Sequence, residues 1–419
     1  MPATDYQGSS STHFHPSPFS SFGRSLLSLR RDIPAVHAGA AMAAVSGEEA
    51  DLEAFQRHVA AHLADLRSGE DELLSIEWIR RLLEAFLLCQ EEFRVVVALA
   101  RRRGGGMSPA SEKMVGDFYE RAVKALDVCN AARDGVDQVR RWERLAGIAA
   151  SVLLVAPAGE IHEGQLRRSR KALSDLSVLL IDDAAAAAAA ASSTTVTSFL
   201  SSHRNRSFGR AAARFSPSRT TANSSSSSSS SFRSLSWSVS RNWSAARQLQ
   251  AIGSGLTAPR GHEGGMAAAV YAMGCLLHLT TWALVAAVPC PDRAAAAAPA
   301  PPSRAAAFPW APPLLALQER IAEEGKRKER RNSSGLLREI HALERCTQRL
   351  AEAIDVAAPT FPLSGERDAK LREAAAELAA VCAAMRDGLE PLERQVREVF
   401  HRIVRSRMEG LDSPMLNAD

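Results

Sequence analysis

Residues 266–288 read MAAAVYAMGCLLHLTTWALVAAV, a run of 23 residues without a charged side chain. A helix rises by about 1.5 Å per residue, so this run is long enough to cross the hydrocarbon core of a bilayer. Seven of its residues are alanine and His278 lies near its middle, which makes transfer into lipid only marginally favourable. The run therefore fits either a membrane-spanning segment or the central buried helix of a bundle. The candidate membrane segment is defined by Met266, Tyr271, Leu276, Leu277, Trp282, Leu284 and Val288.

Amphipathic helices are predicted on the N-terminal side of this run, over residues 47–183. Apolar residues recur at steps of three and four between residues 52 and 66, and again with a wider face between residues 73 and 97. Ser108 followed by Pro109 is typical of a helix start and predicts a third helix. A fourth apolar stretch covers residues 166–181. Each such helix needs a partner to cover its apolar stripe, which predicts a bundle.

Helical periodicity returns after the apolar run. Residues 237–291 hold a tryptophan-containing motif and the apolar helix, and residues 314–412 predict a C-terminal helical pair that packs on the N-terminal helices. The fold class expected is therefore all-α, an elongated multi-helix bundle with long disordered low-complexity insertions.

The insertions have low-complexity composition. Residues 184–236 contain eight alanines (184–191) and eight serines (224–231), too little apolar surface to offset the entropy of ordering, although the alanine tract could extend the preceding helix. Residues 1–46 predict a disordered tail with a short basic-apolar motif at 21–32, and residues 413–419 a second tail. Residues 292–313 are rich in proline and predict a connector in which Phe308 and Trp310 anchor on the bundle.

The charge balance argues against a nucleic-acid binder. The chain carries 51 basic and 47 acidic residues, a net charge of +4, whereas nucleic-acid binders usually have a large and clustered basic excess. The six cysteines lie far apart and form no CxxC pair, which favours reduced, partly buried thiols.

No known catalytic or metal-binding motif is present in the sequence. Nucleotide-binding glycine loops, the HExxH zinc motif and the GxSxG nucleophile turn are absent. His58 and His62 lie one helical turn apart, but no third ligand is evident, so solvated helix positions are the preferred interpretation. We therefore expect a protein that is not an enzyme, with no cofactor, no metal and no small-molecule substrate.

Two kinds of binding or regulatory position can be named. Serines preceded by basic residues, or followed by proline, in exposed sequence suit kinases, and the candidates for phosphorylation are Ser207, Ser216, Ser236 and Ser333. The candidate partner-binding run is residues 237–250, with Trp237, Arg241, Trp243 and Arg247, because tryptophans outside a clear core need an explanation. The alternative is that both tryptophans pack on the protein's own bundle.

Seven stretches of the sequence carry a family resemblance: MPATDYQG at residues 1–8, SFGRSLLSLRRD at 21–32, CQEEF at 89–93, SWSVSRNWSAARQLQ at 236–250, WALVAAVPC at 282–290, FPWAPPLL at 308–315 and RRNSSGLL at 330–337. They resemble segments of the plant BYPASS-related and ROH family. The first two are contiguous in the family, and here residues 9–20 separate them. The start of the chain is closer to the ROH branch, and the alanine and serine tracts depart from the family.

The resemblance implies a function through protein binding and transfers no catalytic residue. ROH-type members look like interactors of the large helical exocyst subunit that binds membranes, so we expect a regulator of polarised secretion with an exocyst subunit as partner. BYPASS-type members look like negative regulators of a mobile root-derived signal that controls shoot growth, which is the alternative. The expected location is the cytoplasm with association with the plasma membrane or endomembranes, or a single membrane pass.

Overall fold

The computed structural model describes residues 39–68, 72–103, 106–155, 160–192, 243–260, 264–290, 296–302, 307–327 and 334–412. The described residues divide into two compact units, with the boundary between Ala50 and Asp51. The packing described below is that of the second unit.

The N-terminal helices follow the predicted apolar periodicity. They are α2 (Gly39–Ser68), α3 (Ile76–Arg102), α4 (Pro109–Leu154) and α5 (Glu163–Ser192). Ser75 and Ser108 cap α3 and α4, since their hydroxyls accept hydrogen bonds from the backbone N–H groups of Trp78 and Ser111. The start of α2 at Gly39 precedes the one expected near residue 47, because alanine-rich sequence favours helix without giving an apolar period. For the same reason α5 continues through the alanine tract.

The remaining helices lie on the C-terminal side of residue 243. They are α6 (Ala245–Gly253), α7 (Gly264–Ala287), α8 (Ala311–Lys326), α9 (Arg338–Ala357), the short 3-10 helix η4 (Ala358–Thr360) and α10 (Gly365–Asp412). The start of α8 lies inside the expected proline-rich connector, because Pro312 and Pro313 occupy its first turn, where a missing N–H costs nothing.

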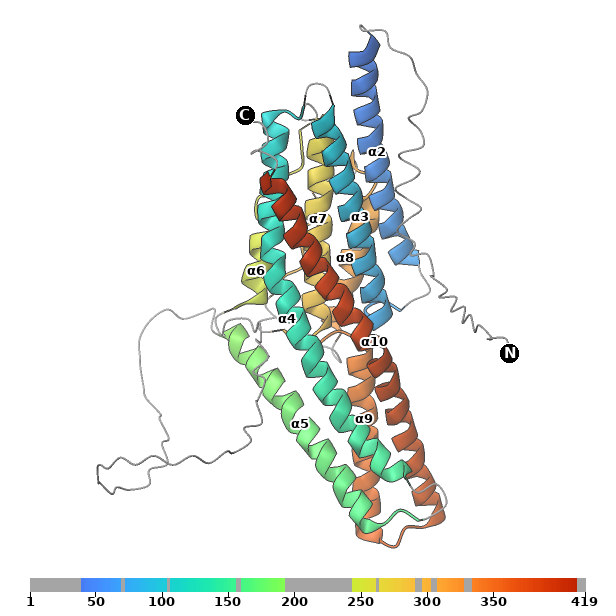
Figure 1. The fold of residues 1–419 in the computed structure, drawn as a ribbon. Helices are drawn as coiled ribbons and strands as arrows, with labels where there is room; N and C mark the ends of the chain where they lie inside the picture. The colour runs from blue at the N-terminus through green and yellow to red at the C-terminus, as the bar shows by residue number, and fades with distance from the viewer. Residues whose placement is uncertain are drawn as a thin grey trace, which may run out of the picture. The chain divides into compact units, whose positions relative to one another are not determined.

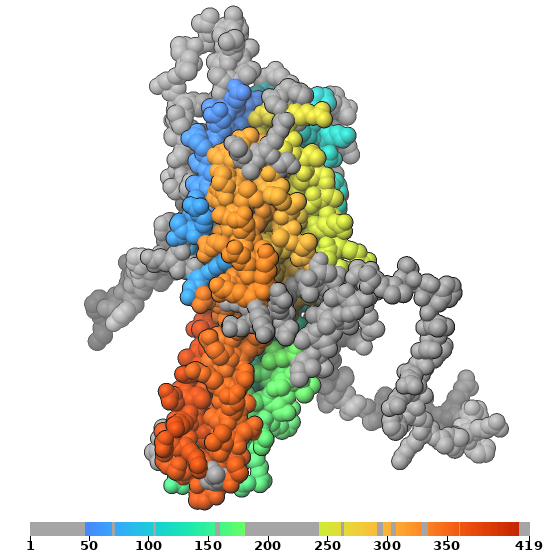
Figure 2. All heavy atoms as spheres, turned by 180° about the vertical axis from the view of Figure 1, so that it is seen from behind, coloured from blue at the N-terminus to red at the C-terminus, as the bar shows by residue number. Residues whose placement is uncertain are grey.

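The two longest helices, α4 and α10, lie side by side and contact most of the others (Figure 1). One half of this pair packs with α3, α6 and α7, and the other half packs with α5 and α9. Seen from behind, α8 lies over the first half while α5 and α9 form the second (Figure 2). The described residues contain no strand, and the all-α bundle expected from the sequence is confirmed.

Candidate interaction surfaces

The candidate membrane segment is α7, and the protein's own helices cover it. Among the described helices it is the one long and apolar enough to cross a bilayer, yet 89% of its most apolar window is buried inside the bundle. It packs against α3, α4, α6 and α8. The seven residues that define the segment are all at most 5% exposed: Met266, Tyr271, Leu276, Leu277, Trp282, Leu284 and Val288. The structure therefore uses the run as the central helix of a core.

Phe308 and Trp310 anchor the proline-rich connector on α7. Both are buried, and their rings stack with centroids 5.4 Å apart. Each ring also lies 5.6 Å from the ring of Tyr271. Aromatic clusters of this kind add to the apolar area that they bury. The expected anchoring of the connector is confirmed.

His278 lies in the middle of α7. Its ring packs against the backbone of Gly253 in α6, where a Cβ atom would lie 2.5 Å from the ring. Burial, together with the nearby charge of Arg121, lowers the pKa of His278 to about 4. The imidazole is therefore neutral at physiological pH and serves packing between helices.

The candidate partner-binding run is only partly described. Trp243 is half-buried and packs against the core, and Ser244 caps α6 by accepting a hydrogen bond from the backbone N–H of Arg247 at 3.3 Å. The Arg247 side chain is exposed. Trp237 and Arg241 lie outside the described residues, as do Ser207, Ser216, Ser236 and Ser333. The structure thus docks the C-terminal part of the run on the protein's own bundle through α6.

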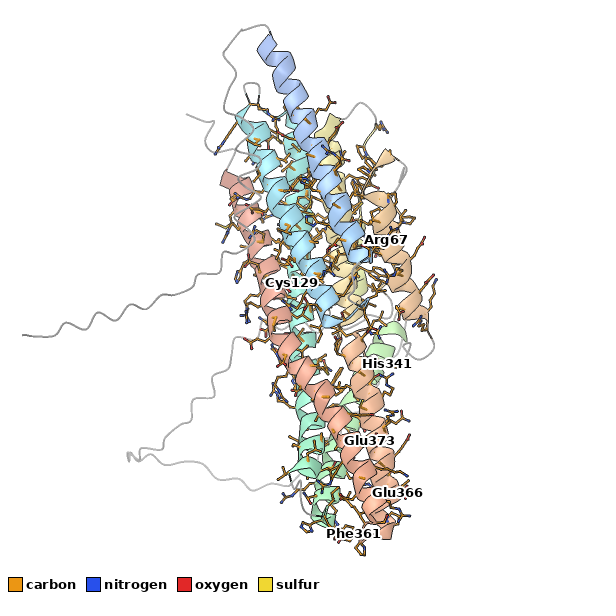
Figure 3. The ribbon with its side chains drawn as sticks, turned by 90° about the vertical axis from the view of Figure 1, so that its right-hand side faces the viewer. Arg67, Cys129, His341, Phe361, Glu366 and Glu373 are labelled. Carbon is orange, nitrogen blue, oxygen red and sulfur yellow. The ribbon has the colours of Figure 1, made fainter. Side chains whose placement is uncertain are left out.

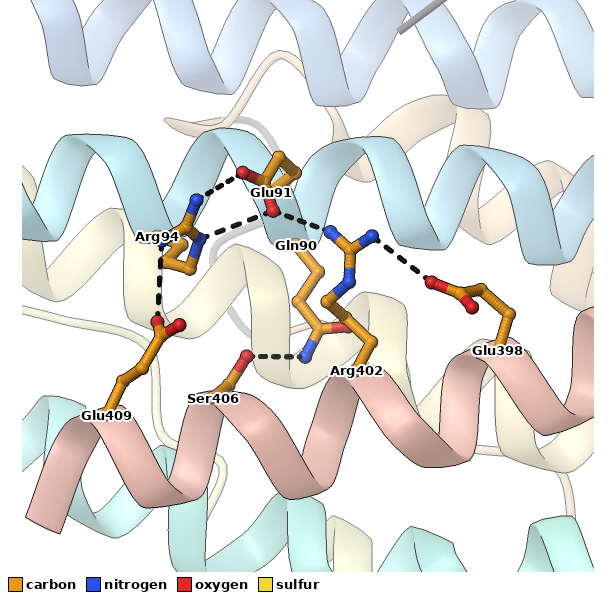
Figure 4. A network of polar contacts seen from close by, with 7 residues as sticks. All are labelled: Gln90, Glu91, Arg94, Glu398, Arg402, Ser406 and Glu409. Carbon is orange, nitrogen blue, oxygen red and sulfur yellow. Dashed lines mark hydrogen bonds and ion pairs between the residues drawn. The ribbon is translucent and has the colours of Figure 1, made fainter. Parts of the chain in front are cut away.

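A polar network joins α3 to α10 at the CQEEF motif (Figure 4). The buried amide of Gln90 donates to the Oγ of Ser406 at 3.4 Å. Glu91 accepts from Arg94 of its own helix and from Arg402 of α10, each at 2.5 Å, and the hydrogen bond from Arg94 leads the effects that lower the pKa of its carboxyl group. In the sequence, this motif contributed only to the family resemblance. The residue pattern of α3 does not indicate which residues of α10 it contacts. The network therefore links α3 to α10 through hydrogen bonds between their side chains.

The cysteine thiols of the described residues lie in the core of the bundle. None of the six cysteines forms a disulfide bond, and all six are buried. Burial raises the pKa of Cys129, Cys275 and Cys382 to about 12, so these thiols stay protonated at neutral pH and are poor nucleophiles. No group of three or more His, Cys, Asp or Glu side chains in the described ranges is arranged to hold a metal ion, and His58 instead bonds to Glu92 at 2.6 Å.

Comparison with known proteins assigns the family. A family model described as "Protein ROH1-like" matches residues 15–414. Protein ROH1D of Arabidopsis thaliana is 42% identical over 425 residues, which cover 99% of this chain and 98% of that protein. Protein ROH1A of Arabidopsis thaliana is 35% identical over 385 residues, covering 87% and 90% of the two chains. No solved structure matches. Because the match spans nearly the whole length, the chain belongs to the ROH1-like family of plant proteins.

Proposed function

We propose that this protein is a non-enzymatic regulator of polarised secretion that acts by binding an exocyst subunit. The observation that carries the proposal is membership of the ROH1-like family over residues 15–414, together with the role that the resemblance to ROH-type proteins implies. The chemistry of the described residues supports a binding role, since the three cysteine thiols with pKa values near 12 and the neutral His278 are poorly suited to catalysis at neutral pH.

The proposed association with membranes is indirect. α7 is covered by α3, α4, α6 and α8, so using it as an anchor would require the bundle to open and expose the cores of those helices to water. A membrane-binding partner such as an exocyst subunit would bring the protein to the plasma membrane or endomembranes without that cost. The alternative location, a single membrane pass, makes the opposite prediction for extraction, which is tested below.

The decisive experiment is binding of the purified full chain to each exocyst subunit separately. Two exocyst subunits known to bind each other in the same assay serve as the positive control. We expect one subunit, a helical one that itself binds membranes, to retain the protein. If the control pair is recovered and no subunit binds the protein, the proposal is wrong.

A loss-of-function plant separates the proposal from the alternative role in a root-derived signal. Altered delivery of secreted cargo with an unchanged metabolite profile of root exudate and xylem sap supports the role in secretion. A changed profile with normal secretion supports the alternative.

A further inference from the structure

The outer face of α10 near its C-terminal end carries an apolar row beside a basic row. Phe400, Val404 and Met408 follow each other at intervals of four residues, so they share one face of the helix. Phe400 and Val404 are half-buried, and the Met408 side chain is 59% exposed, one of the large apolar side chains that the fold leaves in water. A second row, also at intervals of four, consists of the exposed Arg397, His401 and Arg405. We call these two rows the α10 outer face.

The apolar row continues into a groove between α10 and α4. The groove has a volume of about 230 Å³ and is lined by Cys129, Asn130, Arg133, Val396, Arg397, Phe400 and His401. Cys129, labelled in Figure 3, and Val396 are each 2% exposed and supply an apolar floor. The ionisable side chains at its rim are cations or histidine, and no carboxylate lines it. A side chain of leucine or phenylalanine size would fit this floor with acidic groups at the rim.

The positive charge of the rim is only partly neutralised by the protein itself. Arg397 bonds to Glu393 at 2.6 Å, but Glu393 also accepts from Arg140 at 2.5 Å, so two guanidinium groups share that carboxylate. Arg140 reaches Asp137 as well, at 2.9 Å. Arg133 forms an ion pair with Asp134 at 3.6 Å, longer than a hydrogen bond. For Arg405, no ion pair is formed with any described residue.

We propose that the α10 outer face and this groove bind an acidic amphipathic helix of a partner protein. The partner helix would place apolar side chains, spaced three and four residues apart, over Phe400, Val404 and Met408. Its flanking aspartate or glutamate side chains would face Arg133, Arg397 and Arg405. A helix laid along a groove between two helices uses the ordinary ridge packing of helical bundles, and complementary charge sets its orientation and speeds its association.

A lipid surface fits the same face less well. Anionic membranes attract clusters of basic residues, whereas the arginines of this part of α10 are interspersed with Glu398 and Glu409, which form ion pairs with Arg402 and Arg94. The floor is also concave and lies between two helices, which suits a protruding side chain better than a flat headgroup layer. A protein partner is therefore the occupant that the observations favour, and the inference does not depend on which protein that is.

The test uses the full chain and two synthetic helical peptides of about 18 residues, or five turns. Both peptides carry the same leucine and phenylalanine positions, one flanked by glutamate and the other by lysine. We expect the acidic peptide to bind at least about tenfold more tightly than the basic one, measured by fluorescence anisotropy at physiological salt. The double variant R397E/R405E should lose that preference, and M408D should weaken binding of the acidic peptide.

A matched control lies on α5. Arg167 bonds to Glu163 at 2.6 Å, four residues earlier, just as Arg397 bonds to Glu393, and Arg168 is exposed as Arg405 is. The double variant R167E/R168E therefore changes the net charge by the same amount and breaks an ion pair of the same spacing away from the groove, and it should bind the acidic peptide as the unaltered protein does. Circular dichroism of each variant checks that the helices are intact, and the neutral pair R397Q/R405Q, with an intermediate loss expected, replaces R397E/R405E if that variant is unfolded.

Three results would overturn the inference. The first is equal affinity for the acidic and basic peptides, and the second is an equal loss of binding in the α5 control. The third is retention of the peptide preference by R397E/R405E while that variant loses binding to phosphatidylserine vesicles, which would make this face a lipid surface. If no exocyst subunit binds but the acidic peptide does, only the proposed exocyst partner is refuted. If an exocyst subunit binds but the acidic peptide does not, only the proposed binding role of the α10 outer face is refuted.

Discussion

The side chain of Glu339, in the first turn of α9, accepts a hydrogen bond at 3.0 Å from the backbone N–H of Ile76, the first residue of α3. The two residues are 263 positions apart. Beside them, the N–H groups of Leu336 and Leu337 donate to the carbonyl oxygens of Ala286 and Ala287 at the end of α7. The segment of residues 335–339 thus satisfies backbone groups at the ends of two helices at once, and it ties the C-terminal helices to the core.

Two substitutions of Glu339 distinguish the effect of its hydrogen bond on stability from the effect of its charge. The variant Glu339→Ala removes the acceptor and should lower the free energy of unfolding by about 1–2 kcal/mol, as for loss of a helix cap. Burial raises the pKa of Glu339 above its usual value, so at neutral pH its ionised form weakens the fold and the deficit grows as pH rises through that pKa. Glu339→Gln keeps the acceptor without the charge and should be at least as stable as the unaltered protein at pH 7. Urea unfolding at pH 7 measures both, and equal destabilisation by the two variants would contradict this role.

Gly335 should tolerate no side chain. A Cβ atom there would lie 2.4 Å from the carbonyl oxygen of Ala287, a backbone atom that cannot turn aside. We expect Gly335→Ala to destabilise the protein by about 2 kcal/mol, as in other overpacked sites. The control is Gly116→Ala on α4, where a Cβ atom would have no other atom within 4 Å. Alanine should raise the free energy of unfolding there by about 0.5–1 kcal/mol. The Tm should fall in Gly335→Ala and rise in Gly116→Ala. A change of the same sign in both variants would mean that the contact at Gly335 is not tight.

His278 should make stability depend on pH between about 4 and 6.5. Its pKa is lower in the folded protein than in the unfolded chain, so the unfolded chain binds more protons in that range and stability falls as pH drops. Between pH 7 and pH 5 the unaltered protein should lose about 2 kcal/mol more than His278→Gln, in which the neutral side chain cannot titrate. Urea unfolding of both proteins at the two pH values gives the difference directly. An equal loss in both would show that His278 is not held in its neutral form by the fold.

The spacing of apolar residues was enough to predict most helices. It does not show which helices pack against each other. Leu52, Phe55 and Val59 recur with a helical period, and all are buried as that period requires. The start of α8 was predicted too late because Pro312 and Pro313 resemble helix breakers, whereas prolines are accepted in a first turn. The early start of α2 was missed because alanine has helix propensity without an apolar pattern.

The surfaces were harder to predict than the helices. The sequence predicts a helical pair over residues 314–412, but the spacing of residues on one helix does not tell which neighbour faces it. The groove exists because Cys129 and Asn130 of α4 lie against Val396 and Phe400 of α10, a pairing that the local sequence does not encode. In the same way, a pattern cannot pair Gln90 with Ser406, which lie 316 residues apart. Likewise, the pattern of residues 266–288 does not show which helices surround α7.

Alkaline carbonate extraction tests the central claim, that α7 is the core helix of a folded bundle which reaches membranes through partners. The full chain is expressed in plant cells with a tag, membranes are isolated and washed, and an integral membrane protein in the same preparation serves as control. The account predicts that the protein is released by the wash while the control stays in the pellet, and that deletion of residues 266–288 gives an unfolded or degraded chain. Retention of the full chain in the washed pellet, with release of a folded protein on that deletion, would contradict it and make α7 a membrane anchor.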